Sequence, residues 1–308
     1  MNRKKLIWTS FGIIALIIVA LLIQKQTPTE NQGGGSKVIH IVAAENFWGS
    51  LISQLGGDKV SVTSIVTDPN ADPHEYESSS DDARSFANSD YVILNGAGYD
   101  SWSNSLLSAS ASSTRKVLIV SDLLGKKEGD NPHFWYDPDY VNQVVVQMEN
   151  DLIVLDPADA DYFKAQYQML QSSLAEYQNK ITNIKKNFAG TKVASTEDIF
   201  VYLGEATELD LVSPPEFILA VGEGNDPSAQ SVVEFENQLK NKEPKILVYN
   251  EQTVTPVTES VKKLAASESI PVVGITETIQ PAGMKFQDWM DTELVDIENA
   301  LVQTAGHK

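Results

Sequence analysis

Residues 157–188 read PADADYFKAQYQMLQSSLAEYQNKITNIKKNF, and this stretch predicts one uninterrupted α-helix. Its apolar residues follow one another at steps that alternate between four and three, which places them along a single helix face. These residues are Phe163, Tyr167, Leu170, Leu174, Tyr177, Ile181, Ile184 and Phe188. Asp156 is suited to cap the start of the helix, Pro157 to occupy its first turn and Gly190 to end it.

The length of this helix indicates a structural role. At a rise of ~1.5 Å per residue it is about 45 Å long, which is roughly the width of a domain. A spacing of about 3.5 residues is also typical of the seam of a coiled-coil dimer. Because strand-and-helix runs of similar size lie on both sides, we interpret the helix as a strut between two lobes of one chain.

Strand patterns on the two sides of the strut predict lobes of the same type. The expected strands are residues 37–43, 60–66, 91–94 and 117–120 before the strut, and residues 192–194, 209–212, 246–249 and 272–275 after it. Helical patterns lie between them, and the last covers residues 286–304. This alternation predicts an α/β fold with two lobes, each a mostly parallel sheet with flanking helices, joined by one long rigid helix. The expected divisions are an N-terminal α/β lobe at residues 37–155, the connecting helix at residues 156–189 and a C-terminal α/β lobe at residues 190–308.

The N-terminus carries the pattern of a membrane anchor or a signal, which we place at residues 1–23. Three basic residues among the first five precede an apolar run from Leu6 to Ile23, near the lower limit for spanning a bilayer. This order places the N-terminus in the cytoplasm and the body outside. The alternative is a cleaved signal peptide, but no small-x-small site follows Ile23. We therefore favour an anchor at the extracytoplasmic face of the cell membrane, followed by a flexible, glycine-containing linker at residues 24–36.

Composition narrows the classes of partner. The chain has 308 residues and a formal net charge of −19. So acidic a protein suits cations and argues against nucleic acid or anionic lipid as partners. Cysteine is absent, which excludes disulfides, thiolate metal sites and thiol nucleophiles.

Two of the four histidines lie where ligands bind in an α/β fold. His40 lies inside the first expected strand, where we expect a structural role, and His307 lies in the tail. His74 and His133 each follow a proline in a polar segment just beyond an expected strand. Ligands of open α/β sheets bind beyond the carboxyl ends of the strands, so two imidazoles there suggest a metal site. Spacing alone does not distinguish this site from two unrelated loop histidines.

The second half has no histidine before the tail, so further ligands there must be oxygen atoms. Glu197 and Glu277 each follow an expected strand of that half, in the position that the two histidines occupy in the first half. Each glutamate alone also fits a helix cap or a surface residue. The acidic residues that could replace or join them are Asp198, Glu75, Glu77 and Glu223.

Five motifs together resemble one family. They are AAENFWG at residues 43–49, DPHEYE at 72–77, NPHFWYDP at 131–138, STEDIFVYL at 195–203 and VGITET at 273–278. In this order they closely resemble the zinc- and manganese-binding solute receptors of ABC importers. The resemblance implies two α/β lobes joined by a rigid helix, with the metal held between them.

The resemblance also implies a ligand set and partners. His74 and His133 match the ligands of the first lobe, Glu197 matches a position filled by histidine or glutamate, and Glu277 matches a position usually filled by an acidic residue. The implied cargo is one Zn²⁺ or Mn²⁺ per chain, handed to the permease of an ABC transporter in the membrane, and we expect a monomer. Lipid-anchored relatives carry an N-terminal cysteine that this chain lacks, and the histidine-rich loop of many zinc-type members is reduced to residues 124–131.

The chemistry of this ligand set leaves the metal open. Mixed nitrogen and oxygen donors suit zinc or manganese and are poor for copper(I). Glutamates that bind through one oxygen give a tetrahedral, zinc-like site, whereas glutamates that bind through both raise the coordination number and favour manganese. Four protein ligands leave no open position, which favours capture over catalysis.

Two functions from other classes compete with metal capture. A secreted metal-dependent hydrolase needs an open metal position and a general base, but the chain has neither a His-Glu-x-x-His nor a Gly-x-Ser-x-Gly motif. A surface protein of cell adhesion with a purely structural metal is the second alternative. We therefore expect a protein that is not an enzyme.

Overall fold

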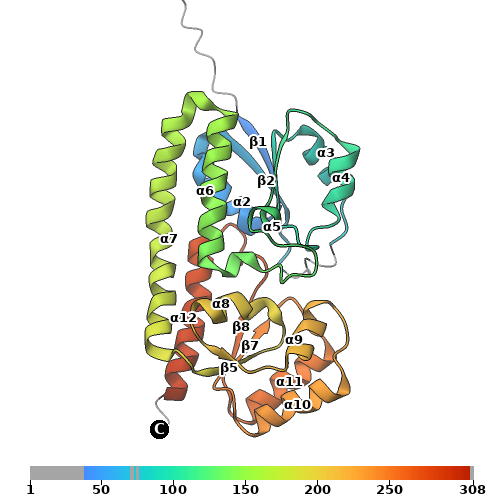
Figure 1. Ribbon diagram of the computed structural model, residues 1–308, viewed down its shortest axis with the longest axis vertical. Helices are drawn as coiled ribbons and strands as arrows, with labels where there is room; N and C mark the ends of the chain where they lie inside the picture. The colour runs from blue at the N-terminus through green and yellow to red at the C-terminus, as the bar shows by residue number, and fades with distance from the viewer. Residues whose placement is uncertain (1–37, 70–72, 74–75, 306–308) are drawn as a thin grey trace, which may run out of the picture. The chain divides into compact units, whose positions relative to one another are not determined.

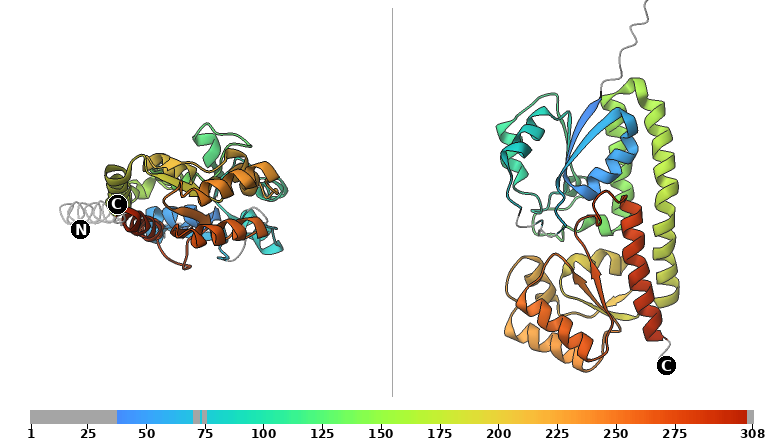
Figure 2. Two further views of the ribbon diagram at one scale, coloured as in Figure 1. Left: turned by 90° about the horizontal axis from the view of Figure 1, so that it is seen from below. Right: turned by 180° about the vertical axis from the view of Figure 1, so that it is seen from behind.

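The computed structural model describes residues 38–69, 73 and 76–305 (Figures 1 and 2). In this part of the chain the strands form two four-stranded sheets, with the orders β2-β1-β3-β4 and β6-β5-β7-β8. Every strand pair within them is parallel. The strands are β1 (Ile39–Glu45), β2 (Val60–Val66), β3 (Tyr91–Leu94), β4 (Lys116–Ile119), β5 (Lys192–Ser195), β6 (Asp210–Leu211), β7 (Leu247–Asn250) and β8 (Val272–Ile275). The predicted α/β class with two mostly parallel lobes is confirmed.

Helices cover both sheets. The first lobe, built on β1 to β4, contains α2 (Asn46–Gly56), α3 (Ser80–Asn88), α4 (Ser103–Ala109), α5 (Val120–Leu123) and α6 (Pro138–Leu155). The second lobe, built on β5 to β8, contains α8 (Val201–Ala206), α9 (Pro215–Gly222), α10 (Ala229–Lys240), α11 (Pro256–Ser267) and α12 (Phe286–Ala305). Short 3₁₀ turns are η1 (Gly57–Lys59), η3 (Phe134–Tyr136), η4 (Pro157–Asp159) and η5 (Asp198–Phe200).

Strand β1 shows why the sheets are parallel and covered. Ile41 and Ala43 belong to a buried cluster with residues of α2 and α6, whereas Val42 and Ala44 belong to another with residues of α3 and α4. Both faces of the strand are therefore covered by helices, which explains its nearly continuous apolar sequence. Because all strands of a sheet are parallel, their carboxyl ends lie along one edge, where the loops can meet.

The long helix α7 (Ala160–Phe188) runs along both lobes (Figure 1). The 3₁₀ turn η4 leads directly into it from Pro157, and Asp156 caps this turn as predicted, accepting a hydrogen bond from the backbone N–H of Ala158 at 3.2 Å. The predicted apolar face is confirmed. Its buried members are Phe163, Leu170, Leu174, Tyr177, Ile181 and Ile184, and Tyr167 and Phe188 are partly buried.

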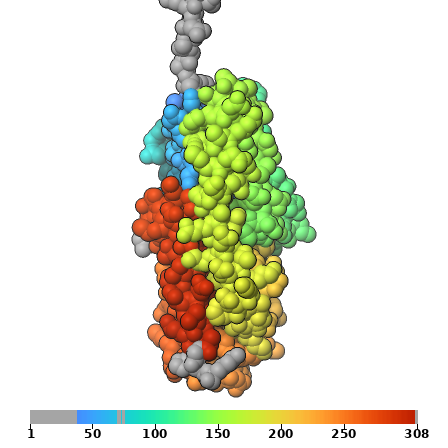
Figure 3. Space-filling view, turned by 90° about the vertical axis from the view of Figure 1, so that its left-hand side faces the viewer, coloured from blue at the N-terminus to red at the C-terminus, as the bar shows by residue number. Residues whose placement is uncertain are grey.

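The apolar face of α7 is covered within the chain. It packs against α2, α6 and α12, and Figure 3 shows α12 lying beside it. This packing supports the interpretation of α7 as a strut. The apolar surface that a coiled-coil dimer would need is already buried within the chain. A single buried cluster contains Ile41 of the first lobe, Leu174 of α7 and Val248 of the second lobe. The two lobes therefore share one core along this helix.

Three expectations concern residues outside this description. No helix among the described residues is both long and apolar enough to cross a membrane. The predicted anchor at residues 1–23, the linker at residues 24–36 and His74 lie outside the described residues.

Candidate metal centre

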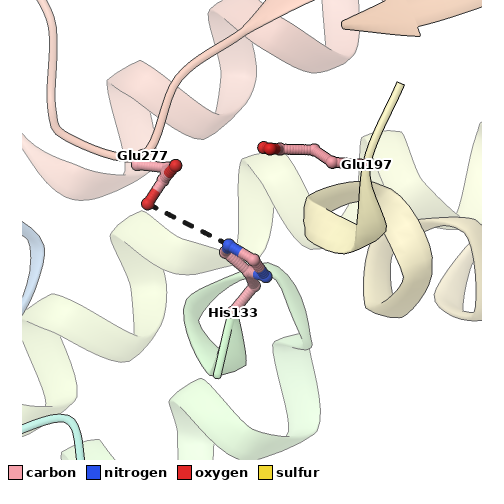
Figure 4. A group of neighbouring side chains, drawn as sticks. All are labelled: His133, Glu197 and Glu277. Atoms are coloured by element: carbon pink, nitrogen blue, oxygen red, sulfur yellow. Dashed lines mark ion pairs between the residues drawn. The ribbon is translucent and has the colours of Figure 1, made fainter. Parts of the chain in front are cut away.

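Three of the four predicted ligands converge in the structure. His133, Glu197 and Glu277 each offer one donor atom, and these atoms lie within 4.8 Å of one another. Their side chains are buried, with exposed fractions of 1%, 2% and 0%. Figure 4 shows His133 pointing toward Glu277, with 4.0 Å between His133 Nε2 and Glu277 Oε2. One histidine from the first lobe thus faces two carboxylates from the second.

The imidazole of His133 is oriented by the side chain of Asn131. Asn131 Nδ2 donates to the backbone carbonyl of Asp198 at 2.7 Å, so its Oδ1 faces His133 and lies 2.8 Å from Nδ1. An amide oxygen only accepts, so Nδ1 of the neutral ring carries the hydrogen and Nε2 carries the lone pair. Nε2 is the atom on the side of Glu277, and a second hydrogen-bonded nitrogen of this kind is typical of metal-binding histidines.

Aromatic residues surround the same ring. Tyr99 and Trp135 meet His133 edge to face, with ring centroids 6.3 and 5.2 Å away. Phe47 in turn stacks on Trp135, with ring centroids 4.1 Å apart. These contacts restrict the imidazole to one orientation and keep bulk water away from it.

Glu277 is held by residues of both lobes. Its backbone N–H donates to Gln252 Oε1 at 2.7 Å, and the next residue, Thr278, donates to the same atom at 3.1 Å. From the first lobe, the Tyr99 hydroxyl donates to Glu277 Oε2 at 2.7 Å. The carboxylate therefore lies on the line where the lobes meet.

Glu197 and Glu277 share one hydrogen-bond donor, Asn250. Its side-chain Nδ2 donates to Oε1 of each glutamate. Asn250 and Gln252 were not predicted from the sequence, because their amide side chains are not typical metal ligands. Their position at and just after the end of β7, on the same edge as the two glutamates, was the available signal.

A buried acid ties the elements beside the ligands together. Glu293 of α12 accepts from the Tyr136 hydroxyl at 2.7 Å and from the Thr276 backbone N–H at 2.9 Å. Tyr136 belongs to the turn after His133, and Thr276 directly precedes Glu277. Burial raises the pKa of Glu293 to about 8 and raises that of Tyr136 well above its usual value.

The rival acids that the structure describes are not part of this group of donor atoms. Asp198 Oδ1 lies 3.6 Å from His133 Nδ1, the ring nitrogen that does not face Glu277. Glu77 and Glu223 are exposed. His40 lies within β1 as predicted and is exposed. Glu75, His307 and the fourth predicted ligand, His74, are outside the described residues.

The described residues next to His74 contact both lobes. Tyr76 donates through its hydroxyl to Asp82 Oδ2 at 2.9 Å, in the first lobe. On the other side, the Pro69 carbonyl accepts from Gln280 Nε2 of the second lobe at 2.9 Å. Of the described residues on the two sides of His74, Tyr76 thus contacts the first lobe and Pro69 contacts the second.

Comparison with known proteins identifies the family. The profile of the family described as "Zinc-uptake complex component A periplasmic" (ZnuA) matches residues 41–300. The chain belongs to this family, which confirms the resemblance seen in its sequence.

Individual relatives agree with this assignment. The chain is 27% identical over 216 residues to the "Manganese-binding lipoprotein MntA" of Halalkalibacterium halodurans, covering 68% of this chain and 70% of the relative. It is 22% identical over 294 residues to the "Metal ABC transporter substrate-binding lipoprotein FimA" of Streptococcus parasanguinis, covering 89% and 92%. These relatives are binding proteins rather than enzymes, as expected for this chain.

Solved structures share the fold. The periplasmic zinc-binding protein TroA of Treponema pallidum superposes with a TM-score of 0.74 at 17% identity, covering 86% of this chain and 99% of that one. The binding protein FpvC of Pseudomonas aeruginosa, in complex with Mn²⁺, gives 0.71 at 19% identity, covering 87% and 100%. The two-lobe architecture is therefore that of known metal-binding proteins.

Proposed function

We propose that this protein captures one Zn²⁺ or Mn²⁺ ion outside the cytoplasm, between its two lobes, and delivers it to the permease of an ABC importer. One observation carries the proposal: His133, Glu197 and Glu277 come from three separate segments and place one donor atom each within 4.8 Å. The predicted fourth ligand is His74. The family and the functions for which the relatives are named support metal transport as the purpose of the site.

The charge of the site favours a divalent cation. Two buried carboxylates close together are costly unless a positive charge or strong hydrogen bonds offset their repulsion. With two neutral imidazoles, the two glutamates balance the charge of one divalent ion. The donors are nitrogen and oxygen atoms, which suit zinc and manganese alike.

The proposal includes a place in the cell. Several relatives are named lipoproteins, whereas this chain has no cysteine to carry a lipid. We propose that the apolar run within residues 1–23 takes over the anchoring and holds the body at the extracytoplasmic face. Recovery from cells of a shortened form that begins between residues 24 and 36 would contradict the anchor and favour a cleaved signal.

Metal binding by purified, metal-stripped protein without a histidine tag tests the proposed site. We expect calorimetry to give one Zn²⁺ or Mn²⁺ per chain, Glu197→Ala to lose most of the affinity and the neighbouring Asp198→Ala to keep it. Equal losses in both variants would contradict the assignment of Glu197. Metal uptake by a strain lacking the protein tests delivery, and unchanged uptake would favour the adhesion alternative.

A further inference from the structure

We propose that Asn250 is a specificity-determining residue that limits Glu197 and Glu277 to one metal-binding oxygen each, and thereby favours Zn²⁺ over Mn²⁺. This inference rests on the proposed function, because it concerns the same ion. Asn250 does not touch the ion in this account. It acts through the oxygen atoms that it holds.

The topology of the second sheet places Asn250 between the two glutamates. It is the last residue of β7, which lies between β5 and β8 in the sheet. Glu197 follows β5 and Glu277 follows β8, so the residue at the carboxyl end of the strand between them can reach both. The Asn250 side chain is 1% exposed, which makes its hydrogen bonds independent of solvent.

The orientation of the amide is fixed. Asn250 Oδ1 accepts from the backbone N–H of Gln252 at 2.9 Å, so Nδ2 is directed to the other side. Nδ2 donates to Oε1 of Glu197 and to Oε1 of Glu277, and it also contacts Thr253 Oγ1 at 3.0 Å. An amide nitrogen has only two hydrogens, and ionised carboxylates only accept. Both hydrogens therefore have acceptors on this side.

This arrangement separates the two oxygens of Glu277. Its Oε1 is held by Asn250, whereas its Oε2 is the atom that lies 4.0 Å from His133 Nε2. To bind an ion through both oxygens, the carboxylate must share Oε1 between the ion and the Asn250 amide, which competes with the geometry set by this hydrogen bond. Weakening the hydrogen bond of a buried amide donor is unfavourable.

The effect on the two metals differs. Zinc is typically bound by four ligands in a tetrahedron, and glutamates that each give one oxygen satisfy it. Manganese belongs with the metals that suit octahedral oxygen-rich sites, so it gains more from glutamates that give two oxygens. By holding one oxygen of each glutamate, Asn250 therefore disfavours the higher coordination number.

A matched pair of variants tests this role. Asn250→Ala removes the amide, and Thr253→Val removes the other Nδ2 contact while leaving both bonds to the glutamates. We expect Asn250→Ala to lower the ratio of the Mn²⁺ to the Zn²⁺ dissociation constant about tenfold, a typical effect of residues that support metal ligands. Thr253→Val should leave that ratio within about twofold. Competition titration measures the ratio, and circular dichroism checks that each variant is folded.

The coordination of the wild-type protein gives a test without a variant. X-ray absorption of the zinc-loaded protein should show about four nearest neighbours, with each glutamate bound through one oxygen. Glutamates bound through both oxygens would overturn the proposal, as would an unchanged metal ratio in folded Asn250→Ala. Failure of wild-type protein to bind either metal would instead overturn the proposed function.

Discussion

The two lobes have the same sheet topology, but their equivalent asparagines form different hydrogen bonds near the proposed metal site. In both sheets the third strand in sequence lies between the first and the fourth. Asn95 directly follows that strand in the first lobe, and Asn250 ends it in the second. Asn95 donates to the Pro132 carbonyl at 2.9 Å, next to His133, whereas Asn250 donates to the carboxylates themselves. The asparagine of the first lobe thus holds the backbone next to a proposed ligand, whereas the asparagine of the second lobe holds the proposed ligands' own oxygens.

Acidic residues at the first strands show a similar contrast. Glu45 ends β1 and Glu197 lies two residues beyond β5, at corresponding edges of the two sheets. Both are buried, but burial and the nearby Asp100 raise the pKa of Glu45 well above its usual value. Among the described residues, Glu45 has no hydrogen-bond partner on either oxygen, whereas Glu197 has Asn250. A position at the sheet edge is therefore not sufficient for metal binding. The hydrogen-bond donors around the carboxylate matter as well.

Both lobes are fixed on one core along α7, so a substitution in the buried face of this helix should destabilise the whole protein strongly. Leu174 is fully buried in the cluster shared by both lobes, so Leu174→Ala should lower the free energy of unfolding by about 2–5 kcal/mol. Met169 on the same helix is 61% exposed, and Met169→Ala should change it by less than about 0.5 kcal/mol. Denaturant unfolding of metal-free protein measures both, and similar small losses would contradict a shared core.

The buried acid that links the lobes gives a pH-dependent effect on the order of a few kcal/mol. Burial raises the pKa of Glu293 to about 8, so the folded protein holds this proton more tightly than the unfolded chain. The resulting stabilisation is fully present below the ordinary carboxyl pKa and is lost as the pH rises through about 8. Glu293→Gln should therefore lose less stability than wild type between pH 5 and pH 8.5, as measured by thermal denaturation of metal-free protein.

A matched variant on the same helix controls this measurement. Asp296 of α12 is exposed, so Asp296→Asn should follow the wild-type dependence. If Glu293→Gln and wild type lose stability in parallel across this range, the link through Glu293 does not titrate as described.

Substitutions of the two asparagines, Asn95 and Asn250, should differ in their effect on metal binding. Asn95→Ala should weaken the binding of both metals about tenfold, because it loosens the loop that carries His133 without touching a carboxylate. The ratio of the two dissociation constants should remain that of wild type, in contrast to Asn250→Ala. Parallel competition titrations measure the difference. A changed ratio in Asn95→Ala would show that the first lobe, too, affects the preference between the two metals.

Regular patterns made most of the fold predictable. The strands at 60–66, 91–94 and 272–275 have the predicted bounds, since apolar runs between turn signals mark buried strands clearly. The predicted strand at 209–212 is reduced to Asp210–Leu211, because only two residues of it pair with β5 at the sheet edge. Short edge pairing depends on the neighbouring strand, and the local sequence carries little of that information.

The site was predictable only in part. His133, Glu197 and Glu277 could be named because they are metal-binding types that follow strands of parallel sheets. Tyr99, Asn250 and Gln252 are neutral polar residues, which occur in most loops and form no pattern. The role of Asn250 becomes visible only when β7 is known to lie between β5 and β8, and strand order was not predictable from the sequence.

Anomalous diffraction from a crystal of the zinc-loaded protein shows whether the ion binds between His133, Glu197 and Glu277. The account predicts one strong peak at zinc-binding distance, about 2.0–2.2 Å, from His133 Nε2 and from one oxygen each of Glu197 and Glu277. His74 is the expected fourth neighbour of that peak. A fully loaded crystal with no peak among these three side chains, or with its zinc bound elsewhere on the chain, would contradict the account.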